Sequence, residues 1–128
     1  MKKTFLLLLL SVQFTICFSQ SFICTDFYAK STWFTPNEIQ EERNRTLGTK
    51  ATLTIYDKTL KLVSYKENSE KRRPIVYDKA KDGNYQYKKN SSFSYVIKLN
   101  KILGYIKSFK VIVYEDGKES GYVLYKRE

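Results

Sequence analysis

Apolar and polar residues alternate along most of this chain, and no other feature constrains its fold as strongly. Residues 50–56 place Ala, Leu and Ile on one face and Lys, Thr and Tyr on the other, and residues 93–99 repeat the pattern. A repeat of two residues is the signature of a half-buried β-strand. Tyr, Phe, Val, Ile and Thr, which suit a pleated surface, are frequent here. The sequence therefore predicts an all-β domain.

Short turn sequences separate the alternating segments, among them Asp57-Lys58, Asp82-Gly83-Asn84 and Asp116-Gly117. Asp-Gly is a strong signal for a tight hairpin. Short links between neighbours favour an antiparallel up-and-down meander, and closing such a meander removes its exposed edges. We expect a small closed or nearly closed barrel, with an open curved sheet or a sandwich as alternatives. About eight strands are predicted, near residues 22–29, 50–56, 60–65, 75–77, 85–87, 93–99, 105–114 and 121–126.

One segment departs from the alternation and predicts a short helix over about residues 36–46. Thr35 and Glu38 have the spacing of a capping box, with Pro36 at the first helical position. Glu41 and Arg45 are placed for an i,i+4 ion pair, and Gly48 is a suitable stop. Ile39 is the only apolar residue inside the segment, so we expect the helix to lie on the surface of the sheet.

The N-terminus predicts export of the protein. Lys2 and Lys3 precede an apolar run that continues, with polar interruptions, to Phe18, and this arrangement is typical of a secretory signal peptide. Cys17 and Ser19 place small residues at the −3 and −1 positions, which favours cleavage between Ser19 and Gln20. Cleavage there leaves residues 20–128 as a single domain. The leader resembles those of secreted proteins from the Bacteroidota. We expect a secreted or periplasmic protein whose mature chain has no membrane-spanning segment.

Cleavage would leave Cys24 as the only cysteine of the mature chain, because Cys17 belongs to the leader. Lipidation of either cysteine is disfavoured, since both follow isoleucine instead of a small residue. A single cysteine forms no internal disulfide, so it is either buried or available to another chain. Burial is the favoured interpretation, because free cysteine is among the most buried residue types.

The sequence contains no histidine. This excludes catalytic triads that rely on histidine, and it removes the commonest metal ligand. No phosphate-binding glycine loop or calcium-binding EF-hand motif is present. Carboxylate pairs could run glycoside hydrolysis, but only Asp26 and Asp78 lie near predicted strands. Asp78 and Asp82 flank a turn without further calcium ligands. We therefore expect a non-enzymatic protein without a cofactor or metal.

The formal charge is +10, and loss of the two leader lysines would leave +8. This charge permits two interpretations. A basic surface can bind a polyanion such as a glycan or lipopolysaccharide, and it can equally serve solubility and protect strand edges. The second is favoured, and no nucleic-acid motif points to a nucleic-acid partner. The candidate contacts for a polyanion are Lys71, Arg72, Arg73, Lys88 and Lys89.

A short element ahead of the helix resembles one found in lipocalins. Ser31-Thr32-Trp33 is similar to their Gly-x-Trp element, with Ser31 in place of the glycine, and Arg127 stands where their basic partner residue lies near the last strand. The resemblance implies a barrel. The leading functional hypothesis is a binding protein that holds a small apolar or amphipathic ligand in a β-barrel. The alternative is a surface-interaction protein that binds an anionic polymer through Tyr and Lys side chains.

Overall fold

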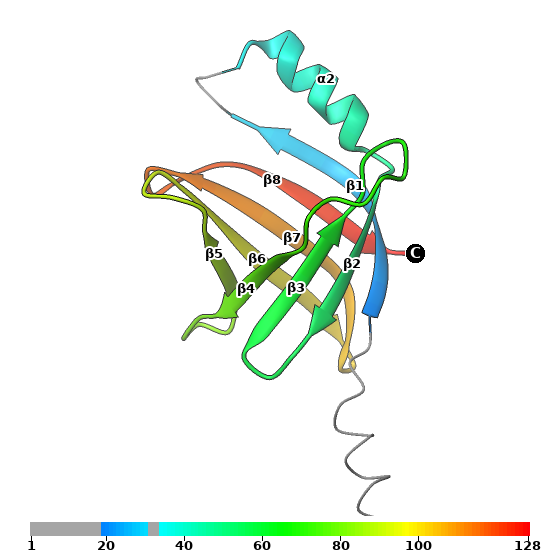
Figure 1. The fold of residues 1–128 in the computed structure, drawn as a ribbon, viewed down its shortest axis with the longest axis vertical. Coiled ribbons are helices and arrows are strands. Elements are labelled where there is room, and N and C mark those ends of the chain that lie inside the picture. The colour runs from blue at the N-terminus through cyan, green and yellow to red at the C-terminus, as the bar shows by residue number, and fades with distance from the viewer. Residues whose placement is uncertain (1–18, 31–33) are drawn as a thin grey trace, which may run out of the picture.

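The computed structural model describes residues 19–30 and 34–128, and these form a closed barrel of antiparallel strands joined in sequence order (Figure 1). The predicted all-β meander is confirmed, and the closed barrel is the correct form among the alternatives. The strands are β1 (Ser19–Ala29), β2 (Lys50–Ile55), β3 (Thr59–Ser64), β4 (Ile75–Lys79), β5 (Tyr85–Lys88), β6 (Phe93–Ile102), β7 (Tyr105–Glu115) and β8 (Lys118–Arg127).

The barrel closes through β1, which pairs with β2 through residues 19–23 and with β8 through residues 22–29. A register shift between Cys24 and Asp26 inserts one extra residue into β1. Such a bulge shifts the alternation by one position, so Cys24 before it and Phe27 after it share the inner face. The bulge therefore keeps the whole length of β1 in the barrel wall with its apolar side inward.

The centre of the barrel is packed with large side chains. The Phe22 and Phe109 rings meet edge-on, with centroids 4.9 Å apart, and Tyr125 stacks on Phe109 at 4.8 Å. An eight-stranded barrel has an interior just wide enough for side chains to fill. The largest fully buried side chains, which come from six of the eight strands, are Phe22, Leu53, Leu60, Tyr77, Ile97, Ile106 and Phe109.

The predicted helix is confirmed as α2 (Pro36–Thr46), and its capping box is complete. The Glu38 amide donates to Thr35 Oγ1, the Thr35 amide donates to Glu38 Oε1, and both distances are 3.2 Å. Gly48 follows the helix end with φ +84°, a conformation that favours glycine. No residue of α2 is buried, as expected for a helix on the barrel surface.

Thr35→Ala should lower the free energy of unfolding by about 1 kcal/mol, because one amide of the first turn loses its side-chain acceptor. Urea denaturation followed by circular dichroism measures the change. Thr35→Ser, which keeps an acceptor oxygen at the same position, is the matched control and should stay close to the parent protein. An unchanged unfolding midpoint in Thr35→Ala would show that the cap does not stabilise the fold.

Several sequence expectations fall on residues outside the described part of the chain. These are the leader up to Phe18 and the Ser31-Thr32-Trp33 element. Ser19, the last residue before the predicted cleavage point, is the first residue of β1. Cys24 is a buried free thiol, so the expectation of burial is confirmed. No helix within residues 19–30 and 34–128 has the length and apolar character that a membrane crossing needs.

Candidate binding pocket at the barrel mouth

Helix α2 lies beside the part of β1 that lacks a second strand neighbour (Figure 1). Residues 24–29 of β1 pair with β8 on one edge, whereas β2 pairs only with the preceding residues. Side chains bind the backbone on this stretch. The Phe27 amide donates to Asp26 Oδ1 at 2.8 Å, and Arg43 of α2 donates to the Phe27 carbonyl. The helix and its arginine therefore cover a strand edge that would otherwise be open to other chains.

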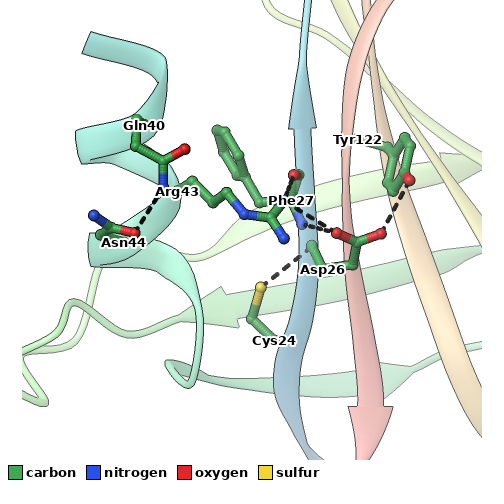
Figure 2. Close-up of polar contacts among 7 residues, drawn as sticks. All are labelled: Cys24, Asp26, Phe27, Gln40, Arg43, Asn44 and Tyr122. Atoms are coloured by element: carbon green, nitrogen blue, oxygen red, sulfur yellow. Dashed lines mark hydrogen bonds and ion pairs between the residues drawn. The ribbon is translucent and has the colours of Figure 1, made fainter. Parts of the chain in front are cut away.

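Asp26 connects this edge to the helix and to β8 (Figure 2). One carboxylate oxygen accepts from Arg43 Nη1 at 3.2 Å, and the other accepts from the Tyr122 hydroxyl at 3.0 Å. The hydrogen bonds from Tyr122, from the Phe27 amide and from Arg43 hold the pKa of Asp26 below its ordinary value. The hydrogen bond between Tyr122 and Asp26 also raises the pKa of Tyr122. The ion pair is part-exposed and adds little stability, so its main effect is to fix where α2 sits.

A pocket of about 340 Å³ opens between α2 and the adjoining end of the barrel, which we call the mouth. Its volume falls within the range of about 300–1,000 Å³ that is typical of small-molecule sites. Most of the pocket wall is apolar, and it comes from the mouth ends of four strands and from the start of the helix. The apolar and aromatic lining residues are Phe27, Tyr28, Ala29, Phe34, Ile39, Phe93, Val113, Gly121, Tyr122 and Val123.

The rim of the pocket is acidic, in contrast to the basic protein as a whole. Glu38, Glu41, Glu42 and Arg45 follow the spacing i, i+3, i+4, i+7, which places them on one face of α2, and Glu115 joins them from β7. Arg45 pairs with Glu42 at 3.2 Å, so the expected pairing with Glu41 is wrong. The i, i+3 partner is as close along a helix surface as the i, i+4 partner. This acidic rim was not predicted from the sequence, although the helical spacing of the glutamates is visible there.

Buried and partly buried aromatic side chains pack together in the barrel core. Tyr77 and Tyr87 lie with ring centroids 5.9 Å apart, and Tyr87 stacks on Tyr95 at 6.0 Å. Burial raises the pKa of Tyr125 to about 12 and raises that of Tyr77 as well. Both hydroxyls therefore stay neutral at physiological pH, as does the Cys24 thiol, whose pKa is also raised by burial. The pocket at the mouth therefore offers room for a small ligand.

The five basic residues proposed for polyanion contact lie at the mouth end but outside the pocket. Lys71, Arg72 and Arg73 belong to the connection from β3 to β4, whereas Lys88 ends β5 and Lys89 follows it. All five side chains are exposed. The two connections lie at the same end of the barrel as α2 (Figure 1). The structure therefore brings the two groups to one end of the barrel, on separate loops, and none of them lines the pocket.

The sequence also named carboxylates as candidates for hydrolysis or calcium binding, and their positions in the described residues are as follows. The buried polar side chains there are Thr54 and Ser108, so no carboxylate is fully buried among the described residues. Asp78 and Asp82 gain no further ligands, and no group of three metal-binding side chains occurs in the described ranges. The Asp82 carboxylate instead accepts from the amide of Asn84 at 3.0 Å, which stabilises the turn.

Comparison with known proteins identified no family model, curated protein or solved structure that matches this chain. The pocket, its rim and the surrounding charges are therefore the features that bear on function.

Proposed function

We propose that this protein is an exported, non-enzymatic binding protein that holds a small amphipathic molecule in the pocket at the barrel mouth. One observation carries the proposal: an apolar pocket of about 340 Å³ lies between α2 and the open end of a closed barrel. Eight-stranded up-and-down barrels are the architecture in which lipocalins hold a single ligand, which supports a binding role for this fold. Location in the periplasm or outside the cell is part of the proposal.

The rim predicts the charge of the ligand. Three glutamates of α2, Glu38, Glu41 and Glu42, line the rim of the pocket, and the Arg45 beside them pairs with Glu42. Aromatic rings of Tyr28 and Phe34 border the same space, and an aromatic face attracts a cation. An apolar tail on the floor of the pocket and an amine or quaternary ammonium head at the rim would satisfy both features. The preferred ligand class is therefore a small amphipathic cation.

Calorimetric titration with dodecylammonium and dodecanoate, below their micelle concentrations, tests this preference. The two probes share an apolar tail and differ in the sign of the head group. A protein with an overall positive charge attracts the anion at long range, so tighter binding of the cation requires a local acidic site. We expect dodecylammonium to bind more tightly, and Glu41→Lys should weaken its binding about tenfold, because a favourable contact becomes repulsive.

The matched control is Glu67→Lys, which changes the net charge equally at an exposed residue that does not line the pocket. Its affinity for dodecylammonium should stay within about twofold of the parent value, because surface charges are screened beyond about 8 Å at physiological salt. Equal losses in both variants would show that only the overall charge matters. Failure of both probes to bind would remove the support for a small-ligand function.

The alternative function, contact with an anionic polymer, is supported by the position of the basic residues. Lys71–Arg73 and Lys88–Lys89 occupy two exposed connections at the same end of the barrel. An anionic glycan that spans both connections would meet five positive charges there. Tight binding of such a glycan at physiological salt, together with no binding of dodecylammonium, would favour this alternative over the pocket.

A further inference from the structure

The hairpin that joins β6 to β7 places leucine in an unfavourable backbone conformation. Leu103 has φ +51° and Gly104 has φ +85°, so both central residues of the turn are left-handed. This turn prefers Asn or Asp followed by Gly. The chain uses that preferred pair in the hairpin from β7 to β8, where Asp116 and Gly117 have φ +51° and +80°. The same geometry thus carries an aspartate at one turn and a leucine at the other.

The leucine is also in the least favourable place for an apolar side chain, because it is exposed to water. Leu103 is 95% exposed, and its neighbours Ile102 and Tyr105 are 38% and 47% exposed. The turn lies at the end of the barrel away from α2 (Figure 1), so it has no part in the pocket. A residue that is strained in its backbone and exposed in its side chain suggests selection for something other than stability.

The surroundings of this turn are basic. Residues 93–114, which cover β6, the turn and nearly all of β7, contain four lysines and no acidic residue. Lys101 and Lys107 flank the exposed tip, and the Arg127 guanidinium lies over the Tyr105 ring, 5.4 Å from its centroid. Asp57 and Asp82 lie in the other two turns at this end, where Lys58 and Lys81 accompany them. An apolar tip among exposed lysines complements an anionic surface with an apolar layer beneath it.

We propose that the β6–β7 turn is a membrane-contact loop that inserts Leu103 into the interface of an anionic lipid bilayer. Apolar side chains at an interface enter the boundary between headgroups and acyl chains, and nearby lysines add attraction to anionic lipid. Three apolar side chains on one turn are too few for a stable protein interface, which buries about 800 Å² on each partner. A lipid surface needs no shape complementarity, so the bilayer is the occupant that these observations favour.

Vesicle co-sedimentation tests the proposal, with protein purified after export and vesicles of phosphatidylcholine with or without phosphatidylglycerol. We expect binding to the anionic vesicles at physiological salt and much weaker binding to phosphatidylcholine alone. Leu103→Asn should reduce binding to anionic vesicles about tenfold, because it removes the inserted side chain. The same change should leave the melting temperature equal or higher, since asparagine suits the left-handed turn. Loss of binding then cannot arise from unfolding.

Tyr56→Asn is the matched control, since Tyr56 is a 40% exposed aromatic residue next to another turn at the same end of the barrel. Its vesicle binding should match that of the parent protein. The proposal is overturned if the parent does not bind anionic vesicles, if Leu103→Asn binds as well as the parent, or if Tyr56→Asn loses as much binding. A negative result for membrane contact would leave the pocket proposal unchanged, because the two sites lie at opposite ends of the barrel.

Discussion

Phe109→Ala should lower the free energy of unfolding by about 3–5 kcal/mol, the usual cost of removing a buried aromatic side chain. Phe109 is 1% exposed and lies between the rings of Phe22 and Tyr125, so its loss leaves a cavity where β1, β7 and β8 meet. The total stability of a domain is about 5–15 kcal/mol, so this change removes a large share of it. Because β1 closes the barrel, loss of the Phe109 ring weakens the packing that holds the barrel closed.

Urea denaturation of Phe109→Ala and Phe109→Leu provides the measurement. The leucine variant keeps most of the buried apolar volume and should cost much less than the alanine variant. Tyr56→Ala, at an exposed aromatic residue, should stay within about 1 kcal/mol of the parent. A small effect of Phe109→Ala, similar to that of Tyr56→Ala, would mean that the barrel is not held together by its aromatic centre.

Val113→Trp should weaken ligand binding about 100-fold, or about 2.7 kcal/mol, without unfolding the protein. Val113 lines the pocket from β7, where it pairs with Gly121 of β8. The tryptophan ring has room in a space of about 340 Å³, so we expect the free energy of unfolding to change by less than about 1 kcal/mol. In a fully packed site the same replacement would cost about 1–3 kcal/mol. Stability and affinity together therefore report whether the pocket is open and whether the ligand uses it.

Tyr114→Trp is the control for this change, because the next residue of a strand points to the opposite face and Tyr114 does not line the pocket. Its affinity for dodecylammonium should remain that of the parent. If Val113→Trp binds the probe normally, the ligand does not occupy the mouth. If it is strongly destabilised, the pocket is not open space.

Local signals in the sequence were sufficient to predict most elements of the fold. Alternation identified the strands, the Asp116-Gly117 turn identified the last hairpin, and the Thr35–Glu38 pair set the start of the helix. Each of these depends on residues within a few positions of one another. The short links between the strands also indicated their order, because neighbours in a meander pair with each other.

The bulge and the pocket could not be predicted in the same way. Nothing in the alternation of β1 marks the extra residue that follows Cys24, yet that residue turns Phe27 toward the pocket. The bond between Asp26 and Tyr122 joins residues 96 positions apart, and it forms only when β8 closes on β1. The net positive charge of the chain pointed to Lys71–Arg73 as a contact site, whereas glutamates form most of the pocket rim.

The most direct test of the central claim is an amide NMR titration of the protein with dodecylammonium. The structure predicts that chemical shifts change at the mouth, in residues 27–29, 113–115 and 120–123 and along the pocket face of α2. The amides of Ile97 and Ile106, within the packed part of the barrel, should keep their shifts. Changes confined to the loops with Lys71–Arg73 and Lys88–Lys89, or no changes at all, would contradict a ligand pocket at the barrel mouth.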